Sequence, residues 1–213
     1  MNPNTIYHLI LDRSGSMSDC VETTINGFNE QVRKVREIAR EFPDQNLEMS
    51  LTFFNQDVDN VFKNMCPEKV ELLNTRLYRT SGSTALFDAI GKTIFQIENE
   101  MKAKGDRPTD TAVVIIITDG YENASRLFSL KDIRESIMRL EATGRWTFSF
   151  LGATLDAVDV AEQMAFKRKN SYSFEKQDMN SDVWDRVNKS MNSYINKKHL
   201  GRSLDDFYEE DKK

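Results

Sequence analysis

The sequence predicts an α/β fold with a doubly wound, mainly parallel sheet and helices on both faces. Two observations indicate this architecture. Apolar runs at residues 6–11 and 112–118 are typical of strands that are buried on both faces. At residues 20–42 and 84–104, apolar side chains recur every three or four positions, as in helices with one buried face. Strands that alternate with helices in this way form parallel sheets.

The first half of the chain contains three expected strands and one helix. The strand at residues 6–11 is expected in the centre of the sheet. The helix that follows has its apolar residues at spacings of 3, 4, 3, 4 and 3, at Ile25, Phe28, Val32, Val35, Ala39 and Phe42. Pro43 ends this helix, and residues 47–54 alternate between apolar and polar as a strand does. A tight turn at 55–57 and a short strand at 58–61 predict one antiparallel edge strand.

The second half repeats the alternation of helix and strand. The helix at residues 84–104 ends at Gly105 and Pro108, and the β-branched run 112–118 is expected to form a central strand. Ser129 and Asp132 resemble a capping box at the start of the next helix. The remaining expected elements are a strand at 146–151, a helix at 155–165, a strand at 171–174 and a final helix at 182–198.

The length predicts one domain with an acidic tail. A chain of 213 residues is long enough to bury a sizeable single core, which we expect over residues 1–198. Residues 199–213 contain five acidic side chains and few apolar ones. They are expected to form a flexible C-terminal tail.

The composition excludes several functional classes. A formal net charge of −5 argues against a nucleic-acid surface, which would normally be basic. The basic run 167–169 is interpreted as a solvated loop. No apolar run is long enough for a membrane span or an export signal. The two cysteines, Cys20 and Cys66, are expected to be reduced and buried, so the sequence predicts a cytoplasmic protein that binds neither nucleic acid nor membrane.

Five oxygen-bearing side chains stand where strands end or a helix begins. Asp12, Ser14 and Ser16 follow the first strand, Thr84 opens a helix, and Asp119 follows the β-branched strand. Ligands of doubly wound sheets bind beyond the carboxyl ends of the strands, so these residues can meet at one edge. Two carboxylates and three hydroxyls form a hard donor set that favours Mg²⁺, Mn²⁺ or Ca²⁺ over zinc or copper.

The order of these residues resembles a known motif. Asp12-x-Ser14-x-Ser16, then Thr84, then Asp119 is similar to the metal-ion-dependent adhesion site of von Willebrand factor type A domains. The resemblance extends over roughly residues 5–198, because the order of helices and strands also fits. It is greatest to short stand-alone bacterial and phage members of that family.

The resemblance implies both a fold and a function. The fold would be the Rossmann-like fold of that family. The five residues would hold a divalent metal, expected to be Mg²⁺ with Mn²⁺ or Ca²⁺ as alternatives, and the metal would bind an Asp or Glu of a partner protein. In the family, a change of metal ligand is linked to displacement of the final helix, here residues 182–198. The resemblance names neither the partner nor the oligomeric state.

Alternative interpretations remain open. A metal-dependent phosphohydrolase also begins with an Asp after its first strand, but the second Asp of the haloacid dehalogenase motif is replaced by Ser14. Nucleophile-elbow and nucleotide-binding loop motifs are absent from the sequence, so no enzymatic activity is expected. Ser83 or Thr84 could instead cap the following helix. Glu122, Asn123 and Arg126 either select partners at the rim or stabilise their own loop.

Overall fold

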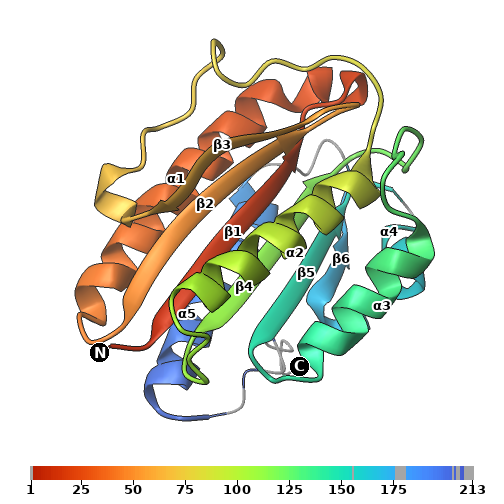
Figure 1. The fold of residues 1–213 in the computed structure, drawn as a ribbon. Helices are drawn as coiled ribbons and strands as arrows, with labels where there is room; N and C mark the ends of the chain where they lie inside the picture. The colour runs from red at the N-terminus through yellow and green to blue at the C-terminus, as the bar shows by residue number, and fades with distance from the viewer. Residues whose placement is uncertain (1, 155, 176–180, 203, 205–206, 209–213) are drawn as a thin grey trace, which may run out of the picture.

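The computed structural model describes residues 2–154, 156–175, 181–202, 204 and 207–208. Six strands form one sheet in the order β3-β2-β1-β4-β5-β6, and helices cover both faces (Figure 1). All neighbouring strands are parallel except β2 and β3, which are antiparallel. The predicted fold class, the central first strand and the antiparallel edge strand are therefore confirmed.

The elements follow the predicted order. The strands are β1 (Asn4–Asp12), β2 (Asn46–Phe54), β3 (Val58–Met65), β4 (Thr111–Thr118), β5 (Trp146–Gly152) and β6 (Ser171–Ser173). The α-helices are α1 (Val21–Glu41), α2 (Leu86–Ala103), α3 (Leu130–Glu141), α4 (Ala157–Gln163) and α5 (Ser181–His199). Short 3-10 turns occur at Gly15–Cys20, Pro67–Lys69 and Arg168–Asn170. Of the predicted helix 155–165, Leu155 lies outside the described residues.

The sheet separates two hydrophobic cores. Tyr7, Leu9 and Leu11 of β1 face the core formed with α1 and α5, whereas Ile6 and Ile10 face the core formed with α2, α3 and α4. Side chains of a strand point alternately to opposite faces, so burial on both faces requires the unbroken apolar runs seen in β1 and β4. The same packing places the carboxyl ends of both strands at one edge.

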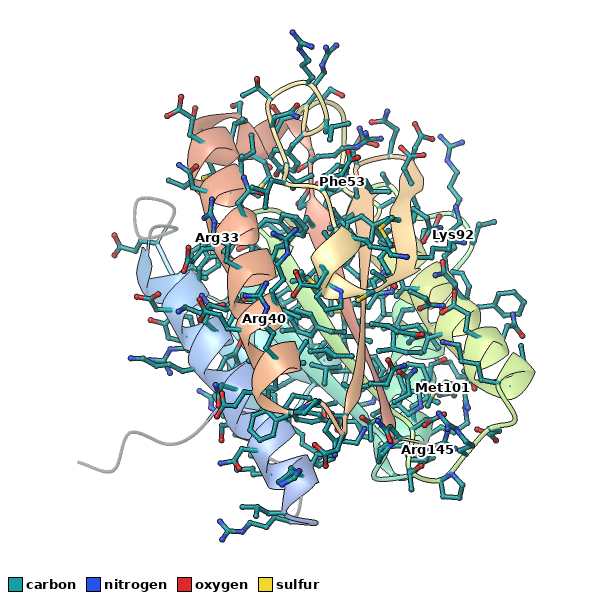
Figure 2. The ribbon with its side chains drawn as sticks, turned by 90° about the vertical axis from the view of Figure 1, so that its left-hand side faces the viewer. Arg33, Arg40, Phe53, Lys92, Met101 and Arg145 are labelled. Atoms are coloured by element: carbon teal, nitrogen blue, oxygen red, sulfur yellow. The ribbon has the colours of Figure 1, made fainter. Side chains whose placement is uncertain are left out.

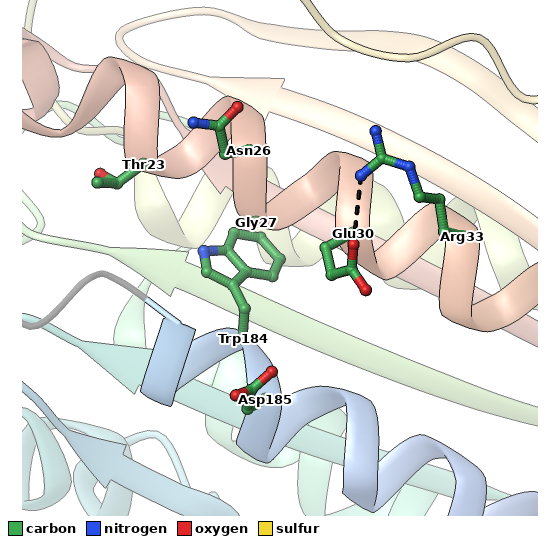
Figure 3. A pocket seen from close by; sticks show the side chains of 7 residues that line it. All are labelled: Thr23, Asn26, Gly27, Glu30, Arg33, Trp184 and Asp185. Carbon is green, nitrogen blue, oxygen red and sulfur yellow. Dashed lines mark hydrogen bonds and ion pairs between the residues drawn. The ribbon is translucent and has the colours of Figure 1, made fainter.

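Helix α5 packs against α1 at very short range. Figure 2 shows the two helices side by side, with Arg33 and Arg40 on α1. Near its start, α5 lays the indole of Trp184 directly over Gly27 (Figure 3), and a Cβ atom at Gly27 would lie only 1.9 Å from Trp184 Nε1. Gln31 and Asn188 are buried on the two helices, and their side-chain amides make no hydrogen bond to any described residue. These two buried amides therefore add close packing, and no hydrogen bond to a described residue, to the α1–α5 contact.

The chain beyond residue 198 still packs on the domain. Phe207 and Tyr208 are buried, although we placed both in a flexible tail. The Tyr208 hydroxyl and Ser149 Oγ of β5 hydrogen-bond each other at 2.7 Å, and Asn170 Oδ1 accepts from the Phe207 amide at 2.9 Å. Packing thus continues at least to Tyr208, while all five acidic residues of the tail lie outside the described residues.

The two cysteines differ in exposure. Both are free, as expected, but only Cys20 is buried. Cys66 is exposed because it follows β3, the edge strand, which runs to Met65 and so extends past the predicted end at residue 61.

Replacement of Gly27 by Ala tests the close α1–α5 contact. Ala favours a helix over Gly by about 1 kcal/mol, but the added Cβ would clash with the Trp184 ring, and overpacking costs roughly 1–3 kcal/mol. At a 1.9 Å approach we expect the clash to dominate, so Gly27→Ala lowers the free energy of unfolding measured with urea. In a Trp184→Leu background the same substitution should be neutral or stabilising, and an equal loss in both backgrounds would contradict the contact.

Candidate metal centre

Asp12 forms the floor of the candidate site. It is the last residue of β1, and its side chain is completely buried. One carboxylate oxygen accepts the Ser14 amide at 2.6 Å, and the other accepts the Thr118 hydroxyl of β4 at 2.5 Å. Because both bonds come from neighbouring strand ends, the carboxylate has a fixed orientation before any ligand binds.

A chain of hydroxyls joins the two strand ends. Ser14 Oγ and Ser16 Oγ lie 3.0 Å apart, and Ser16 Oγ donates to Asp119 Oδ1 at 2.6 Å. Asp119 directly follows β4 and is only 5% exposed, whereas Ser16 is exposed. The site therefore combines buried carboxylates with a hydroxyl at the surface.

Gly120 lies where the loop that contains Thr84 meets the loops that follow β1 and β4. A Cβ atom at Gly120 would lie 3.2 Å from Thr84 Oγ1, 3.5 Å from Ser16 Oγ and 3.8 Å from Asp12 Oδ2. Oxygens from the loop after β1, from Thr84 and from the loop after β4 thus surround one small space. A side chain at position 120 would narrow this space. The structure brings together all five side chains that the sequence singled out.

Thr84 is positioned by its backbone rather than by helix α2. Asn123 Oδ1 accepts the Thr84 amide at 2.9 Å, and the Asn123 amide donates back to the Thr84 carbonyl at 3.0 Å. The alternative that Ser83 or Thr84 caps the helix is not realised, because α2 begins at Leu86 and its N-cap residue, Ala85, makes no side-chain cap bond. The Thr84 hydroxyl is therefore not committed to capping.

The Glu122 carboxylate takes the place of an N-cap side chain at the start of α2. Its carboxylate accepts the Phe87 amide at 2.9 Å, the Ala124 amide at 2.9 Å, and both the amide and the hydroxyl of Ser125 at 2.7 Å. A carboxylate at a helix N-terminus is favourable for the helix dipole as well. Glu122 and Asn123 therefore stabilise their own loop, whereas the Arg126 side chain is exposed and forms no ion pair with the described residues.

Three residues that support the site were not predicted from the sequence. Thr118 holds Asp12, and its position at the end of an apolar run was a signal that could have identified it. The Tyr78 hydroxyl donates to the Asp12 carbonyl, and Asn55 Nδ2 donates to the Ser81 carbonyl at 2.9 Å. These bonds tie the segment before Thr84 to the ends of β1 and β2, and nothing in the local sequence marks Tyr78 or Asn55 for that role.

The electrostatics of the site are those expected for a cation-binding centre. The pKa of Asp12 is raised to about 6, mainly by burial and to a smaller extent by the nearby Asp119, while hydrogen bonds from Thr118 and Ser14 oppose the rise. Two neighbouring buried carboxylates are costly when ionised, and a bound divalent cation would offset that cost. Among the described residues no group of three or more His, Cys, Asp or Glu gathers, so hydroxyls must complete the donor set. This set fits a hard, oxygen-preferring ion.

The sequence model of the von Willebrand factor type A domain matches residues 8–207. The chain belongs to this family. No curated protein matches it in sequence. None of the helices in the described part of the chain is both long and apolar enough to cross a membrane.

Solved structures of this family share the fold at low identity. The ArnB paralog VWA2 from Sulfolobus acidocaldarius is 14% identical with a TM-score of 0.56, covering 87% of this chain and 45% of its own. Manganese-loaded TRAP protein from Plasmodium vivax is 15% identical with a TM-score of 0.57, covering 83% and 70%. Proximal thread matrix protein 1 from the mussel byssus, with a zinc-occupied MIDAS motif, is 16% identical with a TM-score of 0.56, covering 90% and 46%. The chain thus spans less than half the length of two of these three proteins.

Thr118 provides a test of how the site is built. Thr118→Val keeps the shape of the side chain but removes the hydroxyl that fixes Asp12. Loss of such an outer partner typically lowers metal affinity by about 10–100-fold, and we expect that loss for Mg²⁺ in calorimetric titration. Ser83→Ala, an exposed hydroxyl beside Thr84, is the matched control and should bind normally. Unaltered affinity in Thr118→Val would show that Asp12 needs no such support.

Proposed function

We propose that this protein is a protein-binding module that uses a divalent metal, expected to be Mg²⁺, to hold a carboxylate of a partner. The observation that carries the proposal is the convergence of Asp12, Ser14, Ser16, Thr84 and Asp119 around one space at the carboxyl edge of the sheet. Two structural neighbours support it, since one is manganese-loaded and the other has a zinc-occupied MIDAS motif.

The donor chemistry explains why the metal would attract a partner. The hydroxyls of Ser14, Ser16 and Thr84 are neutral and donate little charge to a divalent ion. If Asp12 and Asp119 act through water, the ion remains electron-poor, and Mg²⁺ readily keeps such waters. A carboxylate from another protein can then replace a water on the open side, where Ser16 is exposed.

Binding is favoured over phosphate-ester hydrolysis because no histidine among the described residues lies at the site. The nearest candidate along β1, His8, is completely buried and hydrogen-bonds Thr52 Oγ1 at 2.8 Å. Burial lowers its pKa to about 3, so it stays neutral within the sheet. Ser14 stands where the phosphatase motif needs an acid or base. The proposal includes a cytoplasmic location, supported by the two free thiols of Cys20 and Cys66.

Titration calorimetry on metal-free protein tests the proposal in two steps. Mg²⁺ or Mn²⁺ should bind at one site, and Asp12→Ala should lose this binding while circular dichroism confirms the fold. An acetylated peptide with one Asp should then bind the metal-loaded protein but not the metal-free protein, and the matching Asn peptide should not bind. Equal metal binding by Asp12→Ala, or equal binding of the Asp and Asn peptides, would refute the proposal.

A further inference from the structure

A second cavity lies beside the candidate metal centre, between the start of α2 and the loop that leads into α3. It has a volume of about 500 Å³. Phe87, Leu127, Phe128 and Leu130 form the apolar part of its lining, and the polar part consists of Glu122, Ser125, Arg126, Ser129 and Asp132. Leu127 is 65% exposed and Leu130 37% exposed, so these large apolar groups face solvent. Apolar side chains that gather around an open cavity commonly mark a binding surface.

Part of the cavity lining is held by hydrogen bonds and by packing. Asp88 of α2 accepts the backbone amides of Arg126, Leu127 and Phe128 at 2.9–3.0 Å. The Phe128 ring is pressed onto Gly91, where a Cβ atom would lie 2.5 Å from the ring. The backbone of residues 126–128 and the Phe128 ring are therefore held in place before anything binds, and preorganisation reduces the entropy cost of binding.

The cavity and the metal centre share their structural support. Asn123 forms two hydrogen bonds with the backbone of Thr84, and its neighbour Glu122 bonds the amide of Phe87. Phe87 follows Thr84 by three residues, a stretch of chain that spans no more than roughly 11 Å. A single extended segment of a partner can therefore reach both places.

The charges around the cavity leave one group available to a ligand. The carboxylate of Glu122 accepts four hydrogen bonds, and the carboxylate of Asp132 accepts both the amide and the hydroxyl of Ser129. Both carboxylates are therefore committed to the loop. The Arg126 guanidinium pairs with no described residue, and so it is free to bind carbonyl or carboxylate oxygens of a peptide.

We propose that this cavity is a second recognition subsite, which receives a large apolar side chain from the same partner segment whose Asp or Glu binds the metal. The occupant is an extended acidic peptide with a Phe or Leu within a few residues of the acid, and Arg126 holds its backbone or a second acidic group. The inference rests on the proposed function and adds the sequence preference of the partner.

Short peptides measure this preference directly. The probes are acetylated, amidated octapeptides of Gly and Ser that contain one Asp and one Phe, separated by zero to four residues in either order, each with a Phe→Ala counterpart. They are titrated into Mg²⁺-loaded protein. At one or more spacings, the Phe peptide should bind at least about tenfold more tightly than its Ala counterpart, as burial of an aromatic ring predicts. In ¹⁵N NMR spectra, the amides of Arg126, Leu127 and Phe128 should shift with the Phe peptides but not with the Ala peptides.

Two exposed apolar residues give matched variants. Leu127→Ser removes one wall of the cavity, whereas Phe95→Ser alters a residue of α2 that is 66% exposed and does not line it. Leu127→Ser should abolish the advantage of Phe and leave Mg²⁺ affinity and the Phe→Ala peptides unaffected. Phe95→Ser should change neither. Arg126→Gln should weaken all of the Asp peptides that reach the cavity, without any change in Mg²⁺ affinity.

The failures of the two proposals can be told apart. Asp peptides that bind only with Mg²⁺, but gain nothing from Phe at any spacing, would overturn the subsite and leave the proposed function intact. A Phe advantage that persists in Leu127→Ser would also overturn the subsite. Metal-loaded protein that binds none of the Asp peptides would refute both.

Discussion

The structure depends on one buried carboxylate, that of Asp12. It lies where β1 ends, and its two oxygens are held by the Ser14 amide and by the Thr118 hydroxyl of β4. A buried carboxylate beside Asp119 is electrostatically unfavourable in the isolated chain, as its raised pKa shows. The fold places this unfavourable arrangement at the ends of its two central strands, with Asp12 the last residue of β1 and Asp119 directly after β4. Buried carboxylates that lie close together at strand ends are characteristic of functional sites.

The loops at the carboxyl ends of the strands leave the candidate metal centre accessible to solvent and still hold its residues in position. Thr84 is fixed by Asn123, and the loop that contains Asn123 is fixed in turn by Glu122 and by Asp88. The carboxylates are therefore buried and held, while Ser16 and the apolar walls around Leu127 remain open to solvent. A partner could thus meet a metal and an apolar cavity on one preformed surface.

The sequence predicted the parts of the fold that depend on local patterns. Apolar runs identified β1 and β4, because strands that are buried on both faces are apolar at every position. Apolar residues spaced three or four apart identified α1 and α2, because these helices bury only one face. The five site residues were found for a similar reason, since each stands at the end of a strand or near the start of a helix. Their role as metal ligands remains a proposal. Interactions between distant segments could not be predicted, such as Tyr78 with Asp12, Glu122 with Phe87 and Tyr208 with Ser149. Those contacts arise only when packing brings the segments together.

A crystal structure of the Mn²⁺-loaded protein tests the central claim most directly, because anomalous scattering locates the ion without assumptions about its ligands. The account predicts one strong anomalous peak beside Gly120, within bonding distance of the hydroxyl oxygens of Ser14, Ser16 and Thr84, with Asp12 and Asp119 bound directly or through water. A peak elsewhere, or no peak at this edge of the sheet at saturating Mn²⁺, would contradict the assignment of the site.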